Sequence, residues 1–196
     1  GVFAVGRNHP TIKTALADAL HADLPNLVQM DVSLLAGLLA ERLLAHVPGQ
    51  ERVFFCNSGT EAVEAAIKLA RAATGRPKLL FCEHAFHGLT TGALSLNGAR
   101  AFRDGFGPLL ADAQRVPWNE LGALEAALAA RDVAAFFVEP IQGKGVNLPA
   151  PGYLAEAAAL CRRYGALFVA DEVQTGLGRT GRFLAIEHEP GVDPDL

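Results

Sequence analysis

The stretch Val133-Ala134-Ala135-Phe136-Phe137-Val138 runs directly into Glu139-Pro140-Ile141-Gln142-Gly143. Residues 133–138 are apolar at every position, which is typical of a strand buried on both faces of a parallel sheet. Two similar runs also end in polar residues: Val53–Cys56 before Asn57-Ser58-Gly59-Thr60-Glu61, and Ala166–Ala170 before Asp171-Glu172-Val173-Gln174. Parallel strands end at one edge of the sheet, where ligands bind, so we expect these polar residues to converge there.

Segments with the helical spacing of apolar residues alternate with such strands along the chain. Helices are predicted over residues 10–19, 33–46, 61–73, 121–130 and 153–164, with another after Gly88. Strands are predicted over residues 1–5, 53–56, 79–82, 133–138 and 166–170. This order predicts an α/β fold, with a mostly parallel sheet covered by helices on both faces.

The composition is that of an ordinary globular domain, with 196 residues, 51% hydrophobic residues and a formal net charge of -4. The scattered charges form no basic stripe, which disfavours nucleic acid as a partner. No apolar run approaches the ~20 residues of a membrane span, and the N-terminus lacks a signal-peptide pattern. Cys56, Cys82 and Cys161 have no paired spacing, which favours reduced thiols and a cytoplasmic location. Both ends read as cut, so a fragment truncated at both ends is predicted.

Ser58, Gly59 and Thr60 lie where a strand is expected to pass into a helix. A helix start offers free backbone N–H groups and a partial positive charge, and glycine allows an anion to come close. The pattern therefore suits a phosphate group. The alternative is that Ser58 or Thr60 only caps the helix.

Three other positions suit a planar, charged cofactor. Asp171 follows a buried strand and therefore needs a cationic partner, either a protonated ring nitrogen or a nearby arginine such as Arg179 or Arg182. Glu139 has the same two interpretations. Phe86 could lie flat against a ring or pack in the core.

Several motifs, in the same order along essentially the whole chain, carry a family resemblance. They are Asn57–Ala62 with Ala65–Ala70, Ala85–Gly88, Glu139–Gly143 and Asp171–Gly181. In these segments the chain resembles the class III aminotransferases of the ornithine, acetylornithine and putrescine type, which are fold-type I enzymes that use pyridoxal 5'-phosphate. The resemblance implies that residues 1–196 are part of the cofactor-binding large domain. The small domain and the C-terminal part would lie outside the chain.

The resemblance also implies a role for each matching residue. Ser58, Gly59 and Thr60 would hold the cofactor phosphate, and Phe86 would stack on the pyridine ring, with His87 beside it. Asp171 would pair with the ring nitrogen, Val173 would pack on the other face of the ring, and Gln174 would lie near the ring hydroxyl. Glu139 would lie on the substrate side, so Asp171 and Glu139 are the predicted catalytic residues.

The resemblance implies an amino transfer from an amine or ω-amino acid, putrescine- or ornithine-like, to a 2-oxo acid by a homodimer. The lysine that binds the cofactor covalently is expected beyond the Pro194–Leu196 segment. None of Lys13, Lys68, Lys78 and Lys144 matches its motif, so this chain alone is predicted to be inactive. Leu89 replaces an arginine that binds a substrate carboxylate in ornithine and acetylornithine aminotransferases. The segments Phe106–Leu110, Pro149–Leu154 and Phe183–His188 look closer to putrescine aminotransferases.

Other functions are open at this point. An aminomutase or decarboxylase of the same fold would share these motifs, and a non-catalytic fragment would account for the missing lysine. Gly176–Gly181 has the Gly-x-Gly-x-x-Gly pattern of dinucleotide binding, although no helix is expected to follow it. Cys82, Glu83, His84 and His87 could be drawn as a metal cluster, although a second ligand pair is missing; no metal site is predicted.

Overall fold

The structure is a computed structural model that describes residues 3–22, 24, 33–47 and 49–196. The chain forms two compact units, Gly1–Phe55 and Cys56–Leu196. The described part of the first unit contains helices α1 (Pro10–His21) and α2 (Leu34–Leu44). Pro10 opens α1 because proline tolerates the first helical position, where no hydrogen bond is lost. No helix in the described residues is both long enough and apolar enough to cross a bilayer.

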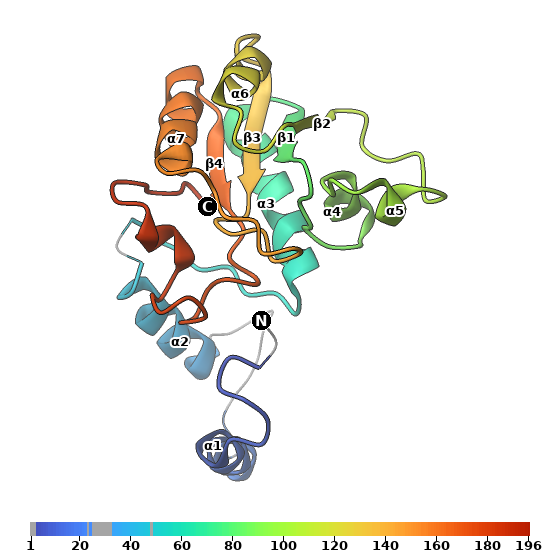
Figure 1. The fold of residues 1–196 in the computed structure, drawn as a ribbon. Coiled ribbons are helices and arrows are strands. Elements are labelled where there is room, and N and C mark those ends of the chain that lie inside the picture. Colours follow the sequence, from blue (N-terminus) through green and yellow to red (C-terminus); the bar gives the residue numbers. More distant parts are fainter. Residues whose placement is uncertain (1–2, 23, 25–32, 48) are drawn as a thin grey trace. The chain divides into compact units, whose positions relative to one another are not determined.

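The second unit is an α/β domain. Its elements are α3 (Gly59–Thr74), β1 (Lys78–Cys82), α4 (Thr91–Ser95), α5 (Arg100–Arg103), β2 (Ala113–Val116), α6 (Leu121–Leu128), β3 (Val133–Val138), α7 (Tyr153–Tyr164), β4 (Leu167–Ala170) and the 3-10 helix η1 (Ala185–His188). The four strands are parallel and lie in the order β2-β1-β3-β4. Figure 1 shows helices on both sides of this sheet. The predicted fold class is confirmed.

Neighbouring residues of each strand face opposite sides of the sheet, and both sides are apolar. On one side Leu80, Phe136 and Phe168 pack with residues of α6 and α7. On the other side Phe81 and Phe137 pack with residues of α3. Burial on both faces accounts for the continuous apolar runs of the strands.

Two predicted strands are wrong in the described residues. Residues 3–5 form a turn, closed by a hydrogen bond from the Gly6 N–H to the Phe3 carbonyl, while residues 1 and 2 lie outside the described residues. Residues 53–56 pair with no strand among the described residues, and Phe54 is 71% exposed. An apolar run becomes a strand only where a ladder partner satisfies its backbone groups. Conversely, β2 was not predicted from the sequence. It is an edge strand whose Gln114 and Arg115 are exposed, so it lacks a continuous apolar run.

Candidate functional site

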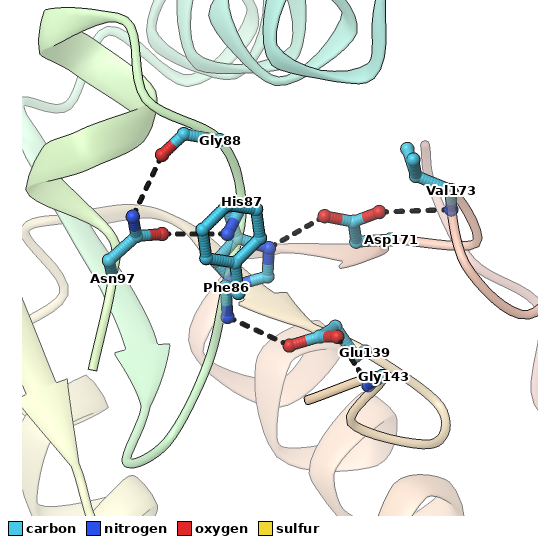
Figure 2. Close-up of polar contacts among 8 residues, drawn as sticks. All are labelled: Phe86, His87, Gly88, Asn97, Glu139, Gly143, Asp171 and Val173. Atoms are coloured by element: carbon cyan, nitrogen blue, oxygen red, sulfur yellow. Dashed lines mark hydrogen bonds and ion pairs between the residues drawn. The ribbon is translucent and has the colours of Figure 1, made fainter. Parts of the chain in front are cut away.

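The polar residues that follow β1, β3 and β4 lie together at the carboxyl edge of the sheet (Figure 2). The ladder between β3 and β4 continues one residue further, because the Asp171 N–H donates to the Val138 carbonyl at 2.8 Å. This bond brings Asp171 next to the end of β3, directly before Glu139. The loop after β1 supplies Phe86, His87 and Gly88 to the same edge.

Asp171 is paired with His87. The distance from His87 Nδ1 to Asp171 Oδ2 is 2.7 Å, and the two side chains are 0% and 7% exposed. Because a carboxylate accepts, Nδ1 carries the proton in this pair. The other oxygen, Oδ1, accepts the Val173 N–H at 3.1 Å. The protein partner considered from the sequence was an arginine, Arg179 or Arg182; the partner in the structure is a histidine.

His87 is itself held by Asn97, which the sequence did not single out. The Asn97 Oδ1 atom accepts the His87 N–H at 2.7 Å, and its Nδ2 atom donates to the Gly88 carbonyl at 2.8 Å. Asn97 is fully buried, so its amide fixes the loop after β1 in one conformation. The only sequence signal for it was an asparagine directly after the mostly apolar segment Ala93-Leu94-Ser95-Leu96. The His87 Nε2 atom is buried and has no hydrogen-bond partner in the described residues.

Glu139 joins two loops through its carboxylate. Its Oε1 atom accepts the Phe86 N–H at 2.9 Å, and its Oε2 atom accepts the Gly143 N–H at 2.8 Å. Burial raises the pKa of Glu139, and the hydrogen bonds from the backbones of Phe86 and Gly143 partly oppose that increase. The contacts that Glu139 makes therefore hold Phe86 and Gly143 in place; its catalytic role stays a prediction.

The start of α3 combines a cap with free donors. Ser58 is the N-cap residue, and its hydroxyl oxygen accepts the Glu61 N–H at 3.4 Å, while Glu61 Oε2 accepts the Asn57 N–H at 2.8 Å. The hydrogen bonds that the Asn57 N–H and the Ser58 hydroxyl donate to the Glu61 carboxylate lower the pKa of Glu61. The capping interpretation of Ser58 is thus confirmed. The N–H groups of Gly59 and Thr60 have no partner among the described residues and remain available to an anion.

The start of α3 packs closely against the loop after β1 and the segment after β4. A Cβ atom on Gly59 would lie 2.7 Å from Val173 Cγ1, and one on Gly88 would lie 2.3 Å from Thr60 Oγ1. The Thr60 and Thr90 hydroxyls are 2.7 Å apart. The segments that contain Gly59, Gly88 and Val173 therefore lie against one another at this edge.

The remaining predicted residues lie at its border. Phe86 is half-buried, and its ring meets the edge of the Phe102 ring with centroids 5.1 Å apart. It is therefore not a fully buried core residue. Val173 is 55% exposed. Gln174 packs against Gly143, where an added Cβ would come within 2.8 Å of Gln174 Cγ.

The alternative sites drawn from the sequence do not form in the described residues. The segment 176–181 makes turns, and the element that follows is the four-residue 3-10 helix η1, not the helix that a dinucleotide fingerprint requires. No group of three metal-ligating side chains occurs in the described part of the chain. Cys82 is buried against Tyr153, and burial raises the pKa of its thiol to about 12. A thiol of that kind is a poor metal ligand.

The fold and this edge define an α/β ligand-binding domain of the kind found in transaminases. Its backbone matches that of the ornithine aminotransferase from Toxoplasma gondii, a structure that reveals partial occupancy of PLP at the active site, with a TM-score of 0.90 and 36% identity over 98% of this chain and 47% of that one. The model of the family "Aminotransferase class-III" matches residues 1–196. The chain belongs to the class-III aminotransferases.

Two curated relatives agree with this membership. The chain is 46% identical to the aminotransferase PigE of Serratia sp. (strain ATCC 39006), over 100% of this chain and 23% of that protein. It is 44% identical to the acetylornithine aminotransferase of Methanosarcina acetivorans, over 98% of this chain and 48% of that protein. The chain thus spans about half the length of these relatives or less.

Proposed function

We propose that the whole protein is a pyridoxal 5'-phosphate-dependent aminotransferase that moves an amino group from an amine or ω-amino acid, putrescine- or ornithine-like, to a 2-oxo acid. The observation that carries this proposal is the buried Asp171–His87 pair beside the free N–H groups at the start of α3. Family membership and the names of the relatives support the reaction class.

The residues at the sheet edge fit this cofactor chemically. Gly59 and Thr60 offer backbone donors at the positive end of a helix to the phosphate. Phe86 and Val173 offer apolar surface to the two faces of a planar ring, and both are at least partly exposed. Asp171 offers a carboxylate to a ring nitrogen. The phosphate, the two ring faces and the ring nitrogen of the cofactor therefore each have a matching group at this edge.

When bound, the cofactor supplies an electron sink for the carbanion that forms at the substrate. The chain's own contribution is electrostatic. Asp171 would keep a proton on the ring nitrogen, because a buried carboxylate favours a protonated neighbour. His87 and the Val173 N–H hold the Asp171 oxygens, and Glu139 holds the loop that carries Phe86.

We further propose that residues 1–196 are part of the large domain, and that the small domain and the covalently bound lysine belong to other parts of a cytoplasmic homodimer. Lys68 lies on the exposed side of α3, and Lys78 pairs with Asp132 at 2.7 Å. Neither lysine has surroundings that suggest a covalent bond to the cofactor. On this proposal the isolated chain does not transaminate.

Absorbance spectroscopy of the full-length protein, purified with pyridoxal 5'-phosphate, tests the function. We expect a visible band that falls when putrescine or ornithine is added and returns when a 2-oxo acid follows. An Asp171→Ala protein and free cofactor serve as controls. A protein that retains no cofactor, or a band that responds to no amine, would contradict the proposal.

A further inference from the structure

Lys144 places a positive charge beside the aromatic residues of the site. Its Nζ atom lies 4.2 Å from the centroid of the Phe102 ring, which is the shortest cation–ring distance among the described residues. The Phe102 ring in turn contacts the Phe86 ring, with centroids 5.1 Å apart. An ammonium group is attracted to an aromatic face because the quadrupole of the neutral ring makes that face partially negative. The charge is therefore held one ring away from the proposed cofactor-stacking residue.

The backbone that carries Lys144 is fixed to the site. Gly143 donates its N–H to Glu139, whose other oxygen accepts the Phe86 N–H. The turn that contains Lys144 is closed by a hydrogen bond from the Gln142 N–H to the Asn147 carbonyl at 3.1 Å, and Gln142 is fully buried. Lys144 is thus presented from an anchored turn.

No acidic residue neutralises this ammonium among the described residues. None of the ion pairs formed there includes Lys144. The two carboxylates of the site, Glu139 and Asp171, are engaged by backbone N–H groups and by His87. At the position after Gly88, Leu89 offers no charge to a substrate. Lys144 can therefore act on the charge of a substrate that enters beside Phe86 and Phe102.

We infer that Lys144 is a specificity-determining residue that favours a donor with a carboxylate at the end opposite its reacting amine and disfavours a diamine. The inference rests on the proposed function. It narrows the proposed donors, which were amines or ω-amino acids, to the ω-amino acids, because only these carry a carboxylate. A carboxylate gains attraction from the ammonium, whereas the second ammonium of a diamine is repelled.

The test compares two donors with the same four-methylene spacer, 5-aminopentanoate and putrescine, in the full-length enzyme loaded with pyridoxal 5'-phosphate. We expect Lys144→Gln to lower the kcat/KM ratio of 5-aminopentanoate to putrescine about fivefold, as for a partly exposed charge pair. Lys144→Glu should reverse the preference. Lys68→Gln is the matched control, because Lys68 is an exposed lysine on the outer side of α3, and it should leave the ratio unchanged.

A binding measurement separates this inference from the proposed function. Pentanoate has the carboxylate but no amine, so calorimetric titration measures its binding without any turnover. We expect Lys144→Gln, but not Lys68→Gln, to weaken pentanoate binding severalfold. If neither amine reacts but this loss occurs, the donor proposal fails and the role of Lys144 stands. Equal pentanoate binding, or an unchanged donor ratio in both Lys144 variants, would overturn the inference.

Discussion

Asp171 has a carboxylate in which each oxygen has a defined donor. One oxygen faces His87 Nδ1 at 2.7 Å and the other accepts the Val173 N–H at 3.1 Å, and its side chain is 7% exposed. Such a carboxylate cannot move far, and burial from water strengthens its effect on a neighbouring positive charge. The sequence predicted Asp171 at the carboxyl edge of the sheet, and the structure places it there; its role toward a cofactor stays a prediction. The sequence did not predict His87 as its partner, because residues 84 positions apart in the chain meet only through the sheet.

We predict that Asp171→Ala in the full-length enzyme lowers kcat/KM by about a hundredfold or more, as for the loss of a preorganised electrostatic group. Asp171→Asn keeps the shape and the contact with the Val173 N–H but loses the charge, so it should be nearly as inactive. Steady-state kinetics with a saturating 2-oxo acid measures the effect. Circular dichroism shows whether the variants fold. Near-normal turnover in a folded Asp171→Ala enzyme would falsify the role assigned to this residue.

Glu139 gives a prediction about pH. Burial raises its pKa above the ordinary value of 4.5, so the folded state holds the proton more strongly than the unfolded state does. The stability from this group is fully present below pH 4.5 and is lost as the pH rises through the folded pKa. We expect the free energy of unfolding of the wild type, relative to Glu139→Gln, to decrease as the pH rises above 4.5. Urea unfolding across this range measures it, and a constant or increasing difference would contradict the prediction.

At the scale of the element, the start of α3 is shaped by its packing against the segment after β4. Gly59 leaves no room for a side chain, since an added Cβ would lie 2.7 Å from Val173 Cγ1. Gly122, near the start of α6, would meet nothing within 4 Å. The two glycines are therefore a matched pair: both lie in the first turn of a helix, and only Gly59 touches the site.

We predict opposite outcomes for alanine at these positions. Gly122→Ala should be neutral or stabilise the protein by up to about 1 kcal/mol, because alanine favours the helix. Gly59→Ala must displace Val173 and should weaken binding of pyridoxal 5'-phosphate several times more than Gly122→Ala does. Thermal unfolding and cofactor titration of the full-length variants measure the two effects. Equal cofactor affinity in both variants would show that the close approach has no role in binding.

The elements that the sequence predicted best are those buried on two faces. β1, β3 and β4 were predicted to within one residue at each end, because a short, continuous apolar run is typical of a strand covered on both sides. Residues 53–56 have the same pattern but no ladder partner among the described residues, and β2 has a partner but not the pattern. The local run of apolar residues indicates that a segment is buried, whereas strand pairing depends on residues that are distant in the sequence.

At the scale of the whole molecule, the site joins short segments that are separated along the chain but meet on one sheet edge. The motifs allowed the sequence to name most of these segments. The residues that it missed, Asn97 and Thr90, act on other residues of the site and have no motif of their own. The contact between Lys144 and Phe102 also depends on tertiary structure, since a loop after β3 meets a helix before β2. Supporting contacts of this kind arise only when the chain is folded, so no local sequence pattern predicts them.

The lysine that binds the cofactor covalently is a property of the whole protein. Among the chain's lysines, Lys78 is engaged with Asp132 at 2.7 Å, and Lys144 lies over Phe102. Lys68 lies on the exposed side of α3, and neither Lys68 nor Lys13 matches the family's lysine motif. We therefore expect borohydride reduction of the full-length, cofactor-loaded protein to fix the cofactor on a lysine outside residues 1–196, because a nucleophilic lysine must reach the bound cofactor directly. Peptide mass mapping identifies the labelled residue, and an unreduced sample is the control. A label on Lys13, Lys68, Lys78 or Lys144 would contradict the proposal that these residues form only part of the active site.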